Sequence, residues 1–259
     1  MNYFEDLRVE HRDGIATITI NRPENANMFR RKTTLELAEA LRQLRDDPTL
    51  RVGVLTGSGD RFFCVGGEHE PFEGFDHSVV LPIVDVYELL DTIPKPVIAA
   101  VNGFAVGGGN VLQVMCDLSI ASENAVFRQV GPMVGSYDAG FGTWYLEEII
   151  GRKKAKEMWY LNRKYSAQEA LEMGLINEVV PAEELMSHTF EVAHEMISRG
   201  PQALAALKTA FAGRHLGALG QARLAHDILL TQYLTTEEAK ELSSSFSERR
   251  KPDRSHFNR

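Results

Sequence analysis

Apolar and polar positions along the first third of the chain follow two different periods. Residues 15–20 are rich in β-branched side chains and stop at Asn21-Arg22-Pro23, which is typical of a strand that leaves a hairpin turn. Over residues 33–44 the apolar positions recur every three or four residues, which predicts a helix with one apolar face. Residues 52–56 are again a short apolar run bounded by glycine. The pattern therefore predicts strand, helix and strand in succession.

The same alternation continues up to residue 121, with predicted segments helix 81–90, strand 97–101, helix 110–116 and strand 118–121. The rest of the chain is mostly predicted as helices, over residues 153–161, 167–173, 183–198, 201–212 and 217–233. A short apolar segment, 175–180, lies among these helices, and residues 243–259 are polar and basic. Strands separated by helices favour a parallel sheet, whose ligand sites gather at the carboxyl ends of the strands. We therefore expect an α/β core over residues 1–200 and a helical C-terminal region over residues 201–259.

Two short glycine turns, residues 64–68 and 103–110, each follow an apolar run that is predicted as a strand. Glycine allows backbone angles that are closed to other residues, and it lets a ligand approach the backbone N–H groups closely. Two N–H groups aimed at one point would hold a developing oxyanion, which is often the largest electrostatic contribution in acyl chemistry. The structural alternative is that both segments are only turns.

Composition narrows the class of protein. The 259 residues are 44% hydrophobic and 25% charged, as in ordinary globular domains, and the net charge of −8 argues against nucleic acid or an anionic membrane as partner. Cys64 and Cys116 lie in apolar or glycine-bounded runs, which favours reduced, packed thiols. There is no basic leader and no run of about 18 apolar residues, so we expect a cytoplasmic protein. Acidic and histidine side chains in residues 68–77 lack a recognisable ligand spacing, and we predict no metal.

Several motifs, in this order along the chain, resemble those of the crotonase superfamily, also called enoyl-CoA hydratase/isomerase-like proteins: Asn21-Arg22-Pro23, residues 55–57 leading to 63–68, residues 95–103, and the three glycines 107–109 followed by Cys116-Asp117. The resemblance runs from about residue 4 to the C-terminus. It implies stacked repeats of strand, strand and helix, a ββα superhelix, and homotrimers that pair into homohexamers. It also implies a CoA thioester as substrate, no tightly bound cofactor, and an oxyanion hole formed by the backbone N–H groups of Gly67 and Gly108.

The chain departs from the family's hydratases at the residues that activate water. Those enzymes place two glutamates over the substrate, and the corresponding positions here are Val111 and Gly131. General acid–base catalysis needs titratable groups within hydrogen-bond reach of the reacting atoms. We therefore do not expect hydration of a double bond.

Residues 129–142 and 151–159 resemble a narrower branch, which contains 1,4-dihydroxy-2-naphthoyl-CoA synthase and 2-ketocyclohexanecarboxyl-CoA hydrolase. The synthase closes a ring and the hydrolase opens one, both through a thioester enolate. The resemblance implies active-site roles for Ser136, Asp138 and Tyr233, although the match of Tyr233 needs one inserted residue. It also implies that Arg249 neutralises CoA phosphate or reaches a neighbouring subunit.

Gly131 resembles the form of the synthase that binds bicarbonate in place of a side-chain carboxylate, with Gln129 and Trp159 lining the same anion pocket. The synthase has a threonine after the glutamine, and its hydroxyl helps to hold the anion, whereas this chain has Val130. Loss of that hydrogen bond would cost about 1–3 kcal/mol. The synthase also carries a tyrosine in the loop that corresponds to residues 68–77, which contain none here. These departures favour the hydrolase.

Each candidate residue also has a purely structural interpretation. Asp138 and Ser136 are ordinary turn or cap residues beside glycine, Tyr233 is a residue of an amphipathic helix, and Trp159 is a core residue. Arg249 fits a basic tail in water. The leading hypothesis is a carbon–carbon hydrolase acting on a cyclic β-ketoacyl-CoA; the alternatives are the ring-closing synthase and a non-catalytic acyl-CoA binding protein.

Overall fold

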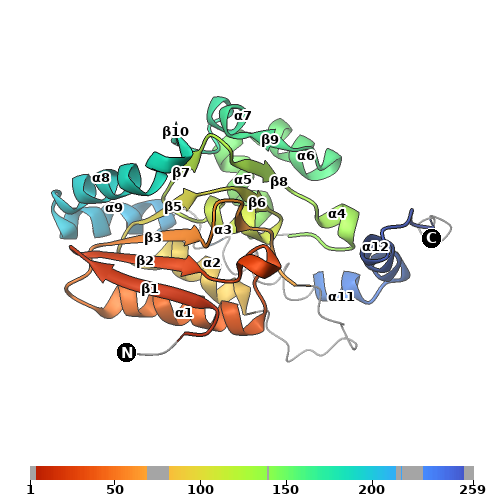
Figure 1. The fold of residues 1–259 in the computed structure, drawn as a ribbon, viewed down its shortest axis with the longest axis horizontal. Coiled ribbons are helices and arrows are strands. Elements are labelled where there is room, and N and C mark those ends of the chain that lie inside the picture. The colour runs from red at the N-terminus through yellow and green to blue at the C-terminus, as the bar shows by residue number, and fades with distance from the viewer. Residues whose placement is uncertain (1–3, 69–81, 139, 214–216, 218–229, 254–259) are drawn as a thin grey trace.

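A six-stranded sheet forms the first layer of the structure, a computed structural model that describes residues 4–68, 82–138, 140–213, 217 and 230–253 (Figure 1). Its strands lie in the order β1 (Leu7–Arg12), β2 (Ile15–Ile20), β3 (Val52–Gly57), β5 (Val97–Val101), β7 (Leu118–Ser122) and β10 (Glu178–Val180). The pair β1–β2 is antiparallel and every later pair is parallel. This confirms the parallel sheet that the alternating pattern predicted.

A second sheet contains the short strands β4 (Phe62–Cys64), β6 (Phe104–Val106), β8 (Val126–Arg128) and β9 (Tyr165–Ser166). The first three are parallel to one another, and β9 is antiparallel to β8. The sequence pattern did not predict this sheet, because strands of two or three residues are too short to show a periodicity. In particular, the segment 103–110 is not one continuous turn after residues 97–101, since it contains β6.

Helices cover both faces of the larger sheet (Figure 1). On one face α1 (Arg31–Asp46) contacts β1, β2 and β3 and packs against α2 (Ile83–Thr92). On the other face α8 (Leu185–Ile197) contacts β3, β5 and β7. Helix α9 (Pro201–Gly213) contacts α2. Side chains alternate along β3: Leu55 belongs to the larger apolar cluster with α1, whereas Val52 and Val54 belong to the smaller cluster with α8.

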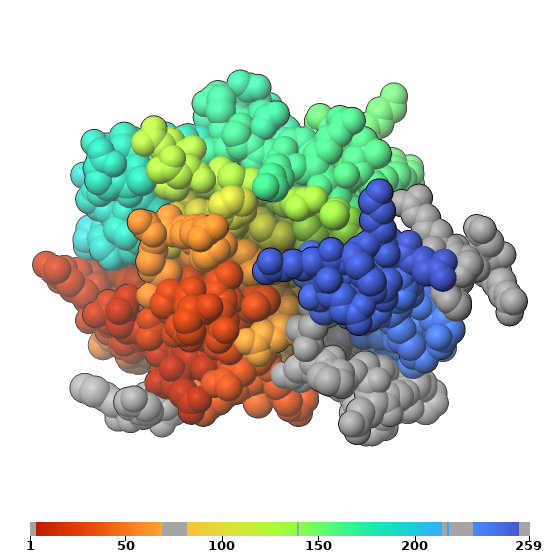
Figure 2. Space-filling view, turned by 45° about the vertical axis from the view of Figure 1, so that its right-hand side comes forward, coloured from red at the N-terminus to blue at the C-terminus, as the bar shows by residue number. Residues whose placement is uncertain are grey.

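The remaining helices are α3 (Gly108–Val114), α4 (Gly131–Val134), α5 (Phe141–Ile150), α6 (Arg152–Leu161), α7 (Ala167–Glu172), α11 (Thr231–Leu234) and α12 (Glu237–Ser247), with short 3-10 turns η1 (Pro23–Asn25) and η2 (Ala182–Glu184). Most of the helix predicted over 217–233 lies outside the described residues. The segment from residue 243, expected as a polar tail, continues α12 to Ser247, and α12 contacts α4. In Figure 2 the blue C-terminal helices lie on the surface of the molecule. Within the described ranges, no helix is long and apolar enough to cross a membrane.

Both cysteines of the chain are free thiols in the structure. Cys64 ends β4 and is fully buried, and burial raises the pKa of its thiol to about 12. The thiol is therefore protonated at neutral pH and packs as a small apolar side chain. Cys64 is therefore packed, as the sequence predicts, whereas Cys116 is partly buried.

Candidate active site

The first glycine turn leaves β4 and pairs with Phe29. The N–H of Phe29 donates to the Gly66 carbonyl at 2.9 Å, and the N–H of Glu68 donates to the Phe29 carbonyl at 2.9 Å. Successive residues of an extended segment point their polar groups to opposite sides, so the N–H of Gly67 points away from Phe29. Gly66 has a φ of +97°, which the turn reaches at little cost only because this residue is glycine.

The second glycine turn joins β6 to α3. Gly107 has a φ of +56° and donates its N–H to the Arg128 carbonyl at 2.9 Å, which fixes the turn to β8. Gly108 is the first residue of α3, so its N–H has no partner within the helix. A Cβ atom built on Gly66 would lie 3.2 Å from the Gly108 nitrogen, so the two turns are in contact.

One aromatic ring lies against both predicted oxyanion residues. A Cβ atom on Gly67 would lie 3.0 Å from Cε2 of Phe29, and a Cβ atom on Gly108 would lie 2.7 Å from Cζ of the same ring. A side chain at either position would therefore displace Phe29. The structure brings Gly67 and Gly108 together, and their role as an oxyanion hole stays a prediction.

Asp138 lies at the beginning of α5, next to the side chain of Val111. Its Oδ1 accepts the N–H groups of Gly140 at 3.1 Å and Gly142 at 2.7 Å, which orients the carboxylate and caps the helix. A Cβ atom on Gly142 would lie 2.7 Å from Cγ2 of Val111 and 3.1 Å from Cγ of Asp138. Asp138 thus places a buried carboxyl group beside Val111, one of the two positions where the family's hydratases carry glutamate.

Tyr87 is a buried polar residue of the same region that the sequence pattern did not single out. Its hydroxyl lies 3.4 Å from the Gly108 carbonyl oxygen, and its ring centroid lies 5.3 Å from that of Phe141. Burial raises the pKa of Tyr87 well above its ordinary value, and the charge of Asp138 raises it further. Its apolar helical neighbours made Tyr87 indistinguishable from a core residue in the sequence.

Ser136 and Gly131 close a tight turn around α4. The N–H of Ser136 donates to the Gly131 carbonyl at 2.9 Å. A Cβ atom on Gly131 would lie 2.6 Å from the Ser136 carbonyl oxygen and 3.0 Å from the Cα of Tyr137. The space in which a side chain at position 131 would begin is therefore filled by backbone.

Tyr233 approaches this turn from the C-terminal region. Its ring centroid lies 5.0 Å from that of Tyr137, the residue between Ser136 and Asp138. The Tyr233 hydroxyl donates to Oε1 of Glu238 at 3.1 Å. Burial raises the pKa of Tyr233, and the negative charge of Glu238 raises it further, so the hydroxyl stays protonated at neutral pH.

The two other predicted pocket residues, Trp159 and Gln129, differ in the hydrogen bonds of their side chains. Trp159 is nearly buried, and its Nε1 donates to the Gly142 carbonyl at 2.8 Å, which ties α6 to α5. Gln129 is completely buried, and among the residues that the structure describes neither Oε1 nor Nε2 of its side chain has a hydrogen-bond partner. An unsatisfied buried amide is costly, so Gln129 is the polar group of this region that needs an explanation.

Arg249 lies beyond the end of α12 and is exposed. Its φ is +54°, and its N–H donates to the Phe246 carbonyl at 3.2 Å. The neighbouring Arg250 is engaged by Glu241 at 2.5 Å. Among the described residues, no group of three or more histidine, cysteine, aspartate or glutamate side chains is arranged to hold a metal ion.

Comparisons with known proteins agree with this architecture. A family model described as enoyl-CoA hydratase/isomerase matches residues 10–256, and the chain therefore belongs to the enoyl-CoA hydratase/isomerase family. The chain has the crotonase fold and is an acyl-CoA-processing enzyme. The family uses CoA thioesters as substrates and has no tightly bound cofactor.

Solved structures of similar proteins cover almost the whole chain. An enoyl-CoA hydratase/isomerase from Pseudoalteromonas atlantica T6c is 26% identical with a TM-score of 0.88, over 96% of this chain and 99% of that one. An enoyl-CoA hydratase from Bacillus anthracis is 32% identical with a TM-score of 0.76, over 96% and 98%. A carnitinyl-CoA hydratase from Mycobacterium avium is 31% identical with a TM-score of 0.81, over 96% and 97%.

Proposed function

We propose that this protein is a hydrolase that opens the ring of a cyclic β-ketoacyl-CoA, such as 2-ketocyclohexanecarboxyl-CoA. The observation that carries the proposal is the position of Asp138, whose carboxyl group and the Val111 side chain both face the Cα of Gly142. Its charge also acts on Tyr87, whose hydroxyl lies 3.4 Å from the Gly108 carbonyl oxygen. Neither hydratase glutamate position provides a carboxylate, since one is Val111 and the other, Gly131, has backbone where a side chain would begin. The acid–base group is thus present but differently placed.

The proposed reaction adds one water molecule and breaks one carbon–carbon bond. Asp138 removes a proton from water, whose oxygen adds to the ring ketone held by Ser136. The bond between the former ketone carbon and the α-carbon then breaks, and its electron pair forms the thioester enolate, stabilised by the N–H groups of Gly67 and Gly108. Tyr233, whose hydroxyl is protonated at neutral pH, assists the return to the α-carbon of the proton that Asp138 took from water. The product is an open-chain dicarboxylic acid mono-CoA thioester.

The C-terminal region, residues 201–259, belongs to this proposal as the part that closes the site and assembles the homotrimer or homohexamer. The contact of Tyr233 with Tyr137 supports the first role. Leu207 and Phe211, on one side of α9, are 56% and 70% exposed, which supports a covered interface in an oligomer. Light scattering on the purified protein tests the assembly, and a monomer would contradict it.

Arg249 belongs to the proposal as a contact to CoA phosphate. Arg249→Ala should therefore raise KM for the CoA thioester and leave kcat unchanged.

A cytoplasmic location is also part of the proposal. It is supported by the two free thiols, Cys64 and Cys116, because a reducing compartment keeps such cysteines unpaired. Localisation of a tagged chain by fractionation would test it, and recovery in an oxidising compartment would contradict it.

The ring-closing naphthoyl-CoA synthase is the second candidate, and Gln129 favours it. A buried amide without a partner among the described residues is the kind of group that a small bound anion such as bicarbonate would satisfy. Gln129 and Trp159 would line that pocket beside Gly131. The Ser136 carbonyl oxygen, which faces the Cβ direction of Gly131, would repel an anion there, and this favours the hydrolase.

Turnover separates the candidates directly. We expect the purified protein to convert 2-ketocyclohexanecarboxyl-CoA in water labelled with oxygen-18, with one labelled oxygen in the new carboxyl group by mass spectrometry. Turnover of succinylbenzoyl-CoA alone, accelerated by bicarbonate, would replace the hydrolase by the synthase. Binding of both thioesters without turnover would indicate a non-catalytic acyl-CoA binding protein.

Asp138→Asn tests the assigned acid–base group. The amide keeps the shape of the side chain and one oxygen for the two N–H donors, but it cannot take a proton from water, so we expect kcat to fall about 100-fold or more. Glu147→Gln, the corresponding carboxylate-to-amide change on a partly exposed residue of α5, is the matched control and should leave kcat unchanged. Equal activity of the two variants would contradict the mechanism.

A further inference from the structure

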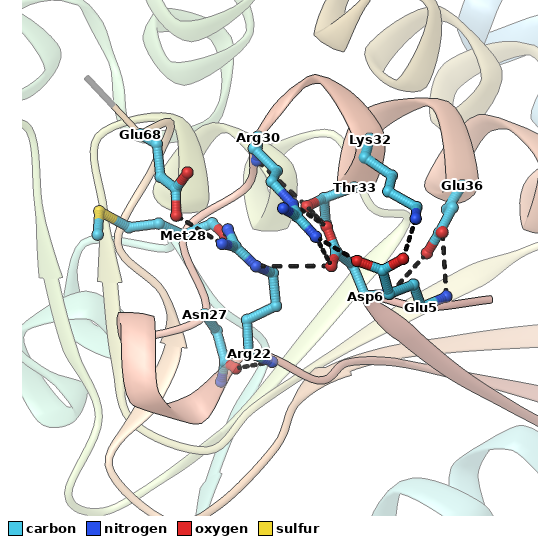
Figure 3. Close-up of polar contacts among 10 residues, drawn as sticks. All are labelled: Glu5, Asp6, Arg22, Asn27, Met28, Arg30, Lys32, Thr33, Glu36 and Glu68. Atoms are coloured by element: carbon cyan, nitrogen blue, oxygen red, sulfur yellow. Dashed lines mark hydrogen bonds and ion pairs between the residues drawn. The ribbon is translucent and has the colours of Figure 1, made fainter. Parts of the chain in front are cut away.

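The guanidinium of Arg22 joins two segments of backbone beside the first glycine turn (Figure 3). Its side chain is 8% exposed; Nη1 donates to the Met28 carbonyl at 2.5 Å and Nη2 donates to Oε1 of Glu68 at 2.6 Å. Nε lies 3.7 Å from Oδ1 of Asp6, which supplies a second negative charge. The arginine therefore holds one carbonyl and one carboxylate in a fixed fork.

The two groups that Arg22 holds flank the backbone pairing of the predicted oxyanion residue. Met28 precedes Phe29 and Glu68 follows Gly67, while Phe29 and Gly67 form the bridge described above. The guanidinium thus ties both sides of this bridge together. Gly67 is exposed and has no side chain of its own, so the direction of its N–H depends on the residues that flank it.

Arg22 is itself fixed by a polar network that reaches into α1 (Figure 3). Asp6 accepts hydrogen bonds from Arg30 at 2.8 and 2.7 Å and from the Thr33 hydroxyl at 2.6 Å, and the hydrogen bond from Arg30 lowers the pKa of Asp6. The backbone N–H of Arg22 donates to Oδ1 of Asn27 at 3.0 Å. The arginine is therefore anchored on both its backbone and its side chain before it reaches Glu68.

We propose that Arg22 and Glu68 are positioning residues that aim the Gly67 N–H at the thioester oxygen. The inference rests on the proposed role of Gly67 in the oxyanion hole. Loss of the ion pair would release the residue after Gly67 without touching the substrate-binding residues named above. Full removal of one oxyanion donor lowers kcat by about 100- to 1,000-fold, so partial misalignment should lower it by about 10- to 50-fold.

Glu68 is the side of the pair to alter, because it is partly exposed and its variants are expected to fold. Glu68→Ala removes the acceptor of the Arg22 fork, whereas Glu68→Gln keeps an oxygen without the charge. Glu36→Gln is the matched control: this partly buried carboxylate belongs to the same network, where it accepts the N–H groups of Glu5 and Asp6. Arg22→Lys keeps the charge and loses the fork, and it serves as a second variant.

The readout combines kinetics with a spectroscopic signal that does not need ring opening. Bound acetoacetyl-CoA reports the oxyanion hole through the near-ultraviolet band of its enolate. We expect Glu68→Ala to weaken the band and to lower kcat with KM within about 3-fold, as for a contact made in the transition state. Glu68→Gln should lie between Glu68→Ala and the wild type, and Glu36→Gln should match the wild type, with all melting temperatures compared.

The outcomes separate this inference from the proposed reaction. A Glu68→Ala variant with the wild-type band and kcat would overturn the positioning role alone. A band that weakens in Glu68→Ala, in a protein that turns over no cyclic substrate, would support the positioning role and refute the proposed reaction. A wild-type protein that forms no enolate band would overturn the role of Gly67 and the positioning inference with it.

Discussion

Asn27→Ala should destabilise the protein strongly, because one buried amide ties the turn after β2 to the strand that carries the first glycine turn. Oδ1 of Asn27 accepts the Arg22 N–H at 3.0 Å, and Nδ2 donates to the carbonyls of Ser58 at 3.0 Å and Phe62 at 2.7 Å. The side chain is fully buried. All three partners are backbone groups, and one of them, the Phe62 carbonyl, belongs to β4.

The size of this destabilisation follows from the backbone groups that lose a hydrogen-bond partner in Asn27→Ala. A buried N–H without a partner costs about 1–3 kcal/mol, and a carbonyl costs less because it has two lone pairs. The Phe62 carbonyl also lies 3.4 Å from Nδ2 of Asn102, which offsets part of its loss. Asn27 has a φ of +53°, where alanine is less favourable by about 1 kcal/mol. We therefore expect a loss of about 3–5 kcal/mol in the free energy of unfolding.

Urea unfolding at one fixed protein concentration measures this loss. Asn27→Gly removes the same hydrogen bonds but tolerates the positive φ, so it should be about 1 kcal/mol more stable than Asn27→Ala. Asn25→Ala, in the same turn, should lie within about 0.5 kcal/mol of the wild type. A loss below about 1 kcal/mol for Asn27→Ala, or an equal loss for Asn25→Ala, would show that the Asn27 side chain does not hold this turn.

Three further perturbations test other contacts. Lys208→Met should cost about 1–3 kcal/mol of stability, because it leaves the Asp117 carboxylate, which is 28% exposed and 2.6 Å from the lysine, without its charged partner. Desolvation already raises the pKa of Asp117, so urea unfolding should show that adding Asp117→Asn recovers part of the loss. The hydrogen bond to Glu178 raises the pKa of His188 above 6.5, so their pairing should stabilise the protein by up to about 1 kcal/mol below pH 6.5 and by less as pH rises. A Glu178→Gln variant whose loss of stability relative to the wild type does not shrink between pH 6 and pH 9 would contradict this. Gly131→Ala should cost about 1–3 kcal/mol, because its Cβ atom would meet a backbone carbonyl oxygen at 2.6 Å, and an unchanged melting temperature would contradict it.

The sequence predicted the elements that carry a clear period. The β-branched run at residues 15–20 is β2, the apolar segment 97–101 is β5, and the helix expected over 33–44 is α1, Arg31–Asp46. The three-residue strands β4 and β6 were missed, because they are held by pairing with each other rather than by a pattern within either one. Neighbours in space, not in sequence, determine such strands.

The candidate site was predictable in its parts and not in its assembly. The glycine turns and Asp138 could be named from their motifs, and the structure brings Gly67 and Gly108 against one ring. That ring belongs to Phe29, which is far from both in sequence and has no local signal. Tyr87 was hidden in the same way, since a buried tyrosine on an amphipathic helix has the spacing of a core residue. The sequence pattern does not show that the Tyr87 hydroxyl lies next to the Gly108 carbonyl.

The tight turn at Gly131 limits how this protein could be redesigned. Grafting a glutamate at that position, to restore a water-activating pair, would drive the new side chain into the main chain of the following residues. The graft would succeed only with a lengthened or rebuilt segment from 131 to 137. A protein engineer who wants hydration from this scaffold must therefore replace a loop, not a residue.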